Sequence, residues 1–291
     1  MDNILRIVDK KGAFRAFVAD TTDLVGKAVK IHDLFPVAAA ALGRTLTAAS
    51  IMGLDLKDES EGLSIQICGD GPLGNIVTAA DCYGNVRGYV DNPHVDIPLK
   101  NNKLDVSGAV GGGFLAIAKN MGMKEPYVGR VDLQTGEIAE DIAYYFMNSQ
   151  QTPSVVALGV LVDVDYTIKA AGGYMIQLLP GADEEIISKL EANVYTLESV
   201  TEMLEKGYDT KRMTRELLLG LDYEILLETN PEYKCNCSQE RMERALVSIG
   251  EKELTSIIEE QGSAELNCHF CQKKYNFDKQ HLCELLEAAK K

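Results

Sequence analysis

The chain has no long apolar run and relatively few positive charges. Nowhere among its 291 residues do eighteen apolar residues follow one another, which argues against an ordinary membrane-spanning helix. The first residues carry no basic segment leading into an apolar stretch, so the sequence predicts a cytoplasmic protein. Lysine and arginine total 29 against 44 aspartate and glutamate residues, a formal net charge of −15. This charge repels phosphate backbones and anionic lipids, so neither nucleic acid nor membrane is an expected partner.

Patterns typical of catalytic sites are also missing. His32, His94 and His281 are scattered and stand near no serine, cysteine or metal-binding pattern, so no hydrolase site can be assembled from them. The glycine cluster at 108–113 is not followed by Lys-Ser/Thr and leads into a predicted strand. This favours a structural bend over a phosphate-binding loop. We therefore expect no enzymatic activity.

The length suits about two domains, and 46% hydrophobic residues suffice for a substantial core. In residues 1–181, alternating apolar segments mix with helical periodicity, which predicts an α+β domain built on an antiparallel sheet. The predicted strands are 13–20, 63–68, 75–82, 86–91, 126–133, 152–162 and 173–179. The predicted helices are one that begins near Thr22, a largely buried one at 36–53, and one that begins near Ile138.

Residues 182–231 are predicted to form an amphipathic helical linker. Residues 183–231 carry 5 basic and 12 acidic side chains, yet apolar residues recur from Ile186 to Leu227. These apolar side chains cannot all face water, so the segment is expected to lie on another surface. A fixed helical cap on the first domain is the simpler interpretation as long as only one state of the protein is considered.

Seven cysteines are present, and four of them form two close pairs near the C-terminal end. Cys235 and Cys237 are separated by one residue, Cys268 and Cys271 by two, and thirty residues lie between the pairs. Two close pairs across such a gap are typical of tetrahedral zinc with four thiolate ligands. His269 lies inside the second pair, but four cysteines already complete the ligand set. The remaining cysteines, Cys68, Cys82 and Cys283, are interpreted as small buried apolar residues.

The pattern of the four cysteines leaves several functions open. Each pair is also placed to close on itself as a disulfide when no metal is bound, so the site is either a purely structural zinc module, a thiol redox switch or a thioredoxin-like catalyst. Residues 232–291, with predicted helices after Ser238, Glu251 and Asp278, are too few to fold firmly without the metal. Oxidation that expels the metal is therefore expected to unfold this segment, and apolar surface under the linker would then be exposed.

Over its whole length the chain resembles the bacterial redox-regulated 33 kDa heat-shock chaperone family. The motifs that carry the resemblance are the two cysteine pairs at this spacing, residues 69–74 (GDGPLG), residues 153–160 (PSVVALGV) and residues 171–180 (AGGYMIQLLP). The resemblance implies an α+β client-binding domain at 1–181, a helical linker at 182–231 and a zinc-binding redox-switch domain at 232–291. It also implies one Zn²⁺ per reduced chain, held by Cys235, Cys237, Cys268 and Cys271.

The resemblance further implies a holdase that needs no ATP and prevents aggregation of unfolding proteins under oxidative stress. Members of the family are inactive when reduced and zinc-bound. Oxidants convert the four cysteines to the disulfides Cys235–Cys237 and Cys268–Cys271, release the zinc and activate a homodimer. Two other classes stay open from the residues. One is a constitutive zinc-ribbon binding module, although residues 232–291 hold 9 basic and 11 acidic side chains and no basic stripe. The other is a thiol oxidoreductase.

Overall fold

Two five-stranded antiparallel sheets form the frame of the first of two units, Met1–Lys234; the second unit is Cys235–Lys291. The structure is a computed structural model and describes residues 1–122 and 125–289. In the first sheet the strand order is β10 (Tyr223–Thr229), β1 (Asn3–Asp9), β2 (Phe14–Asp20), β9 (Ile168–Leu178) and β8 (Ser154–Val162). In the second sheet it is β5 (Val86–Val90), β4 (Asn75–Ala80), β3 (Gly62–Gly69), β6 (Gly113–Asn120) and β7 (Tyr127–Asp132). Strands β3, β4 and β5 form the meander that alternation predicts.

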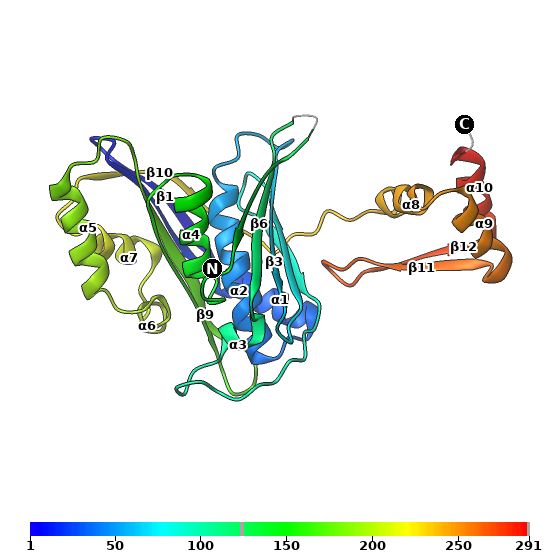
Figure 1. The fold of residues 1–291 in the computed structure, drawn as a ribbon, viewed down its shortest axis with the longest axis horizontal. Helices are drawn as coiled ribbons and strands as arrows, with labels where there is room; N and C mark the ends of the chain where they lie inside the picture. Colours follow the sequence, from blue (N-terminus) through cyan, green and yellow to red (C-terminus); the bar gives the residue numbers. More distant parts are fainter. Residues whose placement is uncertain (123–124, 290–291) are drawn as a thin grey trace. The chain divides into compact units, whose positions relative to one another are not determined.

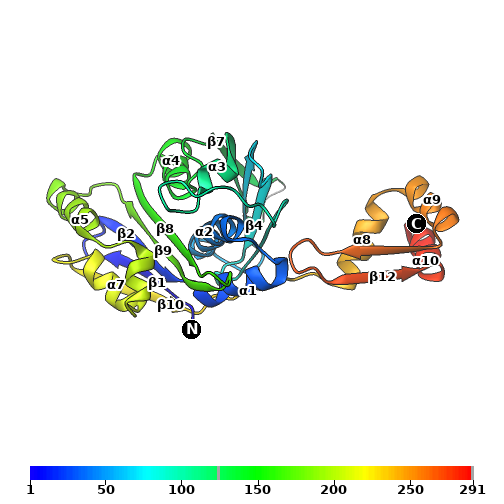
Figure 2. The same cartoon turned by 90° about the horizontal axis from the view of Figure 1, so that it is seen from below.

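Helix α2 (Pro36–Gly53) lies between the two sheets and contacts strands of both (Figures 1 and 2). Almost every residue of the helix is buried, and Arg44 is its one charged side chain. A helix that is apolar on all sides has to be enclosed, and two sheets achieve this. Its alanine-rich first half, 38–41, keeps the helix narrow enough for close approach on both faces. Pro36 at the first turn fits because its missing N–H would have no partner in the helix.

Three further helices complete this inner layer. Helix α1 (Thr22–His32) packs against α2 and β9, and α4 (Ala139–Ser149) packs against β7 and β8, one strand from each sheet. The short helix α3 (Val106–Val110) contains the first part of the glycine cluster at 108–113. There Gly113 has φ +149°, and a Cβ on it would lie 1.9 Å from the carbonyl oxygen of Cys68. The cluster therefore lets two backbones approach closely, which agrees with the structural bend expected from the sequence.

The outer face of the first sheet is covered by α5 (Glu184–Thr196), α6 (Val200–Glu205) and α7 (Thr210–Leu217) (Figures 1 and 2). We call these three helices the capping helices. Each begins at a side chain that accepts a hydrogen bond from a backbone N–H of the first turn: Asp183, Ser199 and Asp209. The apolar faces of the helices join the outward-facing residues of β1, β2 and β9 in a second hydrophobic cluster, separate from the one around α2.

Two strands of the first sheet differ from the sequence expectation. Strand β1 precedes the segment expected as the first strand. Residues 223–229, expected as part of the helical linker, form β10, which pairs with β1. Ile225, Leu226 and Leu227 fit either interpretation by composition. The free edge of β1 decides between them, because antiparallel pairing satisfies the backbone groups of both segments.

The last residues of the first unit are fixed to the edge strand β5. Tyr233 lies in a parallel bridge with Val86, and the backbone N–H of Lys234 donates to the Val86 carbonyl at 2.8 Å. The Tyr233 ring is buried, and its hydroxyl donates to the Gly88 carbonyl at 2.8 Å and lies 2.9 Å from Nε2 of His32. The chain thus leaves the first unit at a well-anchored point, directly before Cys235.

A buried carboxyl group near the start of the chain makes the stability of the first unit pH-dependent. The carboxylate of Asp2 accepts hydrogen bonds from the backbone N–H groups of Asp23 (2.7 Å) and Leu24 (2.6 Å) in the first turn of α1. Burial nevertheless raises the pKa of Asp2 from 3.8 to about 6, since desolvation outweighs these bonds. The folded state therefore favours the protonated side chain.

Replacing Asp2 with asparagine is expected to remove this pH dependence. Because the folded-state pKa lies above the unfolded one, protonation stabilises the wild type fully below about pH 4, and this contribution is lost as the pH rises through about 6. Relative to the wild type, the variant should therefore gain about 3 kcal/mol between about pH 3.5 and pH 7. Urea unfolding of both proteins across this range measures the difference, and a difference that does not change with pH would contradict the assignment.

The second unit contains α8 (Gln239–Ser248), α9 (Glu251–Glu260), the hairpin β11 (Ser263–Asn267) and β12 (Lys274–Asp278), and α10 (Lys279–Ala289). The three helices begin where the sequence predicts them. The hairpin was not predicted. The core of the unit is small and consists of Leu246, Leu254, Ile258, Cys268, Tyr275, Phe277 and Leu282.

The architecture as a whole is the α+β class expected from the sequence, with antiparallel sheets and packed helices. No helix in 1–122 or 125–289 is long and apolar enough to cross a membrane. Residues 182–231 belong to the first unit in the folded chain. The domain boundaries at 181/182 and 231/232 stay a prediction.

Candidate metal centre

The four paired cysteines come together in the second unit from two loops. Cys235 and Cys237 lie in the extended segment before Ser238, whose side chain accepts a hydrogen bond from the Arg241 N–H and so begins α8. Cys268 and Cys271 lie in the turn between β11 and β12. The hairpin pairs Asn267 with Lys274, so residues 268–273 form the loop that holds the second pair.

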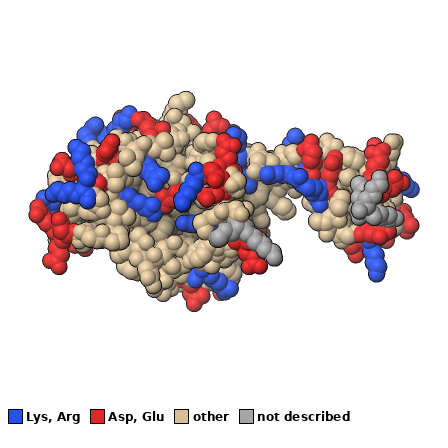
Figure 3. All heavy atoms as spheres, turned by 90° about the horizontal axis from the view of Figure 1, so that it is seen from above, with Lys and Arg blue, Asp and Glu red and all other residues tan. Residues whose placement is uncertain are grey.

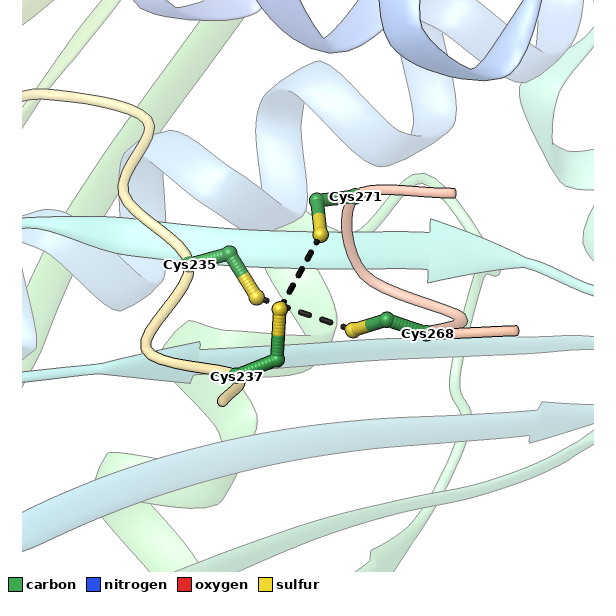
Figure 4. A group of neighbouring side chains, drawn as sticks. All are labelled: Cys235, Cys237, Cys268 and Cys271. Carbon is green, nitrogen blue, oxygen red and sulfur yellow. Dashed lines mark hydrogen bonds between the residues drawn. The ribbon is translucent and has the colours of Figure 1, made fainter. Parts of the chain in front are cut away.

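The loop of the second pair folds back on itself. The backbone N–H of Cys268 donates to the Lys273 carbonyl at 3.0 Å, and the N–H groups of Cys271 and Gln272 both donate to the Cys268 carbonyl. Gln272 takes a left-handed conformation with φ +58° to close this turn. Both sulfur atoms of the pair therefore face the same side of the loop, as Figure 4 shows.

The distances between the sulfur atoms suit a tetrahedral metal ion. All four Sγ atoms lie within 4.8 Å of one another. The Sγ atoms of Cys235 and Cys268 are 3.6 Å apart, and those of Cys237 and Cys271 are 3.4 Å apart (Figure 4). In a tetrahedron with zinc–sulfur bonds of about 2.3 Å, neighbouring sulfurs are about 3.8 Å apart. Four thiol donors at such distances fit Zn²⁺ closely, and the donor set disfavours hard cations such as Mg²⁺ and Ca²⁺.

A tyrosine that the sequence did not single out completes the site. The hydroxyl of Tyr275 on β12 donates to Sγ of Cys237 at 3.1 Å. Partial burial opposes ionisation of Cys237, but this hydrogen bond and those from the neighbouring thiols lower its pKa to about 7. Burial and the shared hydrogen bonds raise the pKa of Cys235 instead. Cys237 is thus the thiol of the group that ionises first, and the hydrogen bond from Tyr275 stabilises its thiolate. The sequence feature that could have pointed to Tyr275 is the alternation of Tyr275 and Phe277 directly after the second cysteine pair.

The other three cysteines lie apart from the four-sulfur group. Cys268 is buried and its partners are half-buried, in contact with the apolar core of the second unit. Cys68 on β3 and Cys82 in the turn before β5 belong to the first unit, where they are half-buried and not fully buried as expected, and desolvation raises the pKa of both thiols. Cys283 is exposed on α10, so its expected place in the core is wrong. In the described part of the chain, the four paired cysteines are the one group of His, Cys, Asp and Glu side chains found at metal-binding distances, and His269 is outside it.

The histidines form no shared site in the described ranges. His32 lies beside Tyr233, His94 pairs with Asp33, and His281 lies 3.1 Å from Glu243. Positive and negative side chains are interspersed on the face drawn in Figure 3, and no extended patch of positive charge is visible there. The face drawn there therefore lacks the basic patch that is typical of phosphate-backbone binding.

The chain therefore combines an antiparallel α+β unit with a small second unit that carries a four-cysteine site of the kind that binds a metal. This combination defines its class. Comparison with known proteins identifies the family. The family model described as "Hsp33 protein" matches residues 2–278. The chain belongs to the Hsp33 family of chaperones, as its sequence motifs indicated.

Individual relatives agree along the whole chain. The 33 kDa chaperonin of Alkaliphilus oremlandii is 51% identical over 286 residues, which cover 98% of this chain and 96% of the relative. That of Clostridium perfringens (strain SM101 / Type A) is 48% identical and covers 100% of this chain and 93% of the relative. The crystal structure of the 33 kDa chaperonin from Thermotoga maritima superposes with a TM-score of 0.89 at 33% identity, covering 98% of both chains.

Proposed function

We propose that this chain is a redox-regulated holdase, held inactive by zinc on Cys235, Cys237, Cys268 and Cys271. The observation that carries the proposal is the convergence of all four sulfurs within 4.8 Å in a unit with a very small core. When bound, zinc holds the four sulfurs as thiolates and ties the two loops together. The zinc stoichiometry is one ion per reduced chain.

Oxidation changes what the four residues hold. Each close pair, Cys235 with Cys237 and Cys268 with Cys271, is already deprotonated on zinc and loses two electrons as its S–S bond forms. Hydrogen peroxide accepts these two electrons, takes two protons from the solvent and is reduced to two molecules of water, while the zinc ion is released. A disulfide sulfur is a poor metal ligand, because the thiolate is the form that binds the ion. The two loops are then no longer tied together, and the second unit loses most of its folding free energy.

The proposed client-binding surface is the outer face of the first sheet, which the capping helices cover. These helices are short, of 13, 6 and 8 residues, and isolated helices of such lengths are marginal in water. Their place on the first sheet therefore depends on packing, and segments of this kind open at lower cost than a central core. We propose that loss of the second unit releases them. The residues that this bares on the sheet are Leu5, Ile7, Phe14, Val18, Tyr174 and Ile176.

The released surface is apolar and suits unfolded polypeptide rather than a folded partner. Holding a client on such a surface needs no ATP and no turnover of substrate, so the protein is proposed to act without enzymatic activity. Exposure of a large apolar face also favours self-association, which supports a homodimer in the active state. Reduced thiols at the metal centre fit a cytoplasmic location. Neither nucleic acid nor membrane is part of this function.

Light scattering from a thermally unfolding client protein tests the proposal. The chain is added either reduced and zinc-loaded or after peroxide treatment under mild unfolding conditions and desalting, and released zinc is measured in the same samples. Only the oxidised, zinc-free sample should suppress aggregation, and reductant with zinc should reverse this. The Cys283→Ala variant should behave like the wild type. Equal behaviour of both samples with zinc still bound would indicate a constitutive zinc-ribbon module instead.

A further inference from the structure

Strand β8 is an edge of the first sheet that carries no charged residue. It pairs with β9 on one side and is the terminal strand in the sheet order. An edge strand presents backbone N–H and C=O groups on its free side, and proteins usually protect such edges with charged residues, proline, bulges or a covering segment. The nine residues of β8, Ser154–Val162, contain no charged residue and no proline, and the one irregularity in their pairing lies at the end of the strand, between Leu161 and Val162.

The other three edges are protected. Strand β10 carries Glu224 and Glu228, and β7 carries Arg130 and Asp132. Strand β5 carries Arg87 and is covered by the chain around Tyr233. Among the four terminal strands that the two five-stranded sheets present in residues 1–122 and 125–234, β8 alone has no charged side chain.

A groove runs along this edge. It has a volume of about 830 Å³ and follows the chain from Val156 to Val164. One wall comes from α2 and the 99–104 loop, including Pro36, Leu99 and Leu104. The other wall is the segment Leu197–Thr201, which leads into α6. The volume is in the range of sites that enclose a ligand, and the groove follows nine residues of the chain, Val156–Val164, about 30 Å when fully extended.

The second wall belongs to the connection between α5 and α6, two of the capping helices. Thr201 lies directly on β8, because a Cβ on Gly159 would be 2.9 Å from Cγ2 of Thr201. The inward-facing side chains of the strand, Val156, Leu158, Val160 and Val162, are fixed against the main core. The strand therefore keeps its shape when the capping helices move away, and the groove becomes wider on its outer side.

We propose that β8 binds an extended segment of an unfolded client as an added antiparallel strand. The inference rests on the proposed function and names the site of client recognition. Backbone hydrogen bonds to an edge strand are made by any sequence. The walls combine apolar residues such as Pro36, Leu99 and Leu104 with the charged residues Arg44, Lys103, Glu140 and Glu198, which favours segments that alternate apolar and polar residues. The absence of charge on the strand suits a neutral segment, and recognition through the backbone suits a protein that holds many different clients.

A pair of peptides tests the backbone contacts. The first is a fluorescein-labelled nine-residue peptide of alternating valine and threonine, and the second is the same peptide with alternate amides N-methylated on one edge. N-methylation removes the donors along that edge and keeps the side chains. Fluorescence anisotropy with the oxidised full-length protein should show binding of the first peptide and at least about tenfold weaker binding of the second. Equal affinities would overturn strand addition.

Two variants locate the site. Leu161→Lys places a positive charge on the half-buried outer side of β8, where the long side chain can still reach water. Val128→Lys makes the same change at an exposed position of the edge strand β7. In the oxidised state, Leu161→Lys should weaken peptide binding at least about tenfold, and Val128→Lys should leave it unchanged. Circular dichroism confirms that both variants are folded.

The same samples separate this inference from the proposed function. If the oxidised wild type suppresses aggregation but Leu161→Lys and Val128→Lys act alike, the β8 site is excluded and the holdase function stands. If no oxidised protein suppresses aggregation, the proposed function fails. The alternative occupant of the edge is a second copy of the chain, and sedimentation velocity tests for it. Loss of a dimer in Leu161→Lys with unchanged peptide binding would assign β8 to self-association and overturn the proposal.

Discussion

Replacing Cys268 with alanine is expected to unfold residues 235–291, abolish zinc binding and release the capping helices, while the core around α2 stays folded. Cys268 is the most buried of the four cysteines, at 5% exposure, and its loss leaves a three-thiol site in a unit whose core has seven buried residues. Structural zinc contributes on the order of 10–16 kcal/mol of apparent folding free energy in units of this kind. The small core alone cannot supply that amount. The hydrophobic cluster around α2 lies entirely within residues 1–234 and contains no residue of the capping helices, so it does not depend on the metal.

Limited proteolysis and zinc analysis measure this outcome together. The variant should bind no zinc and be cleaved rapidly after residue 234 and within the released capping helices, whereas the core around α2 should resist the protease. Cys283→Ala is the matched control, because it removes an exposed cysteine of the same unit from outside the four-sulfur group. A zinc-free Cys268→Ala protein whose second unit still resists protease would show that the metal does not stabilise it.

The four-cysteine group could be predicted from the sequence because its chemistry is local. Two ligands on each short loop need only a chain long enough to bring the loops together, and thirty residues suffice. The hydrogen bond from Tyr275 to Cys237 joins positions 38 residues apart, and it depends on the hairpin that orients β12. Spacing alone contains no information about that hairpin, so the tyrosine was not found.

Long-range pairing explains the differences in the fold as well. Helix α2 was predicted from end to end because an apolar segment of its length, with proline at the first turn, specifies its own limits. Strand β10 was not, because its partner β1 lies more than 200 residues earlier in the chain. The same holds for the exposed edge of β8. Its sequence predicts a strand, but only the order of all five strands shows that one side has no neighbour.

Replacing Leu217 with aspartate is expected to make the reduced, zinc-loaded protein active without oxidant. Leu217 on α7 is 1% exposed and packs against the outer face of the first sheet. The change removes a buried side chain, which typically costs about 2–5 kcal/mol, and it adds the cost of desolvating a charge. The aspartate reaches water if the capping helices detach, so the substitution favours the detached state. Reduced Leu217→Asp should bind the apolar dye ANS and suppress client aggregation with zinc still bound.

Two further variants make this result informative. Arg215→Asp introduces the same residue on the exposed side of α7 and should stay inactive until oxidised. Leu217→Ala removes the packing without adding a charge, so it should respond to less peroxide than the wild type. If the capping helices were a fixed part of the fold, Leu217→Asp would lower the unfolding temperature of the whole first unit and produce no activity. An active variant with intact zinc would instead show that detachment of the helices is the activating step, and that oxidation at the four cysteines acts by allowing it.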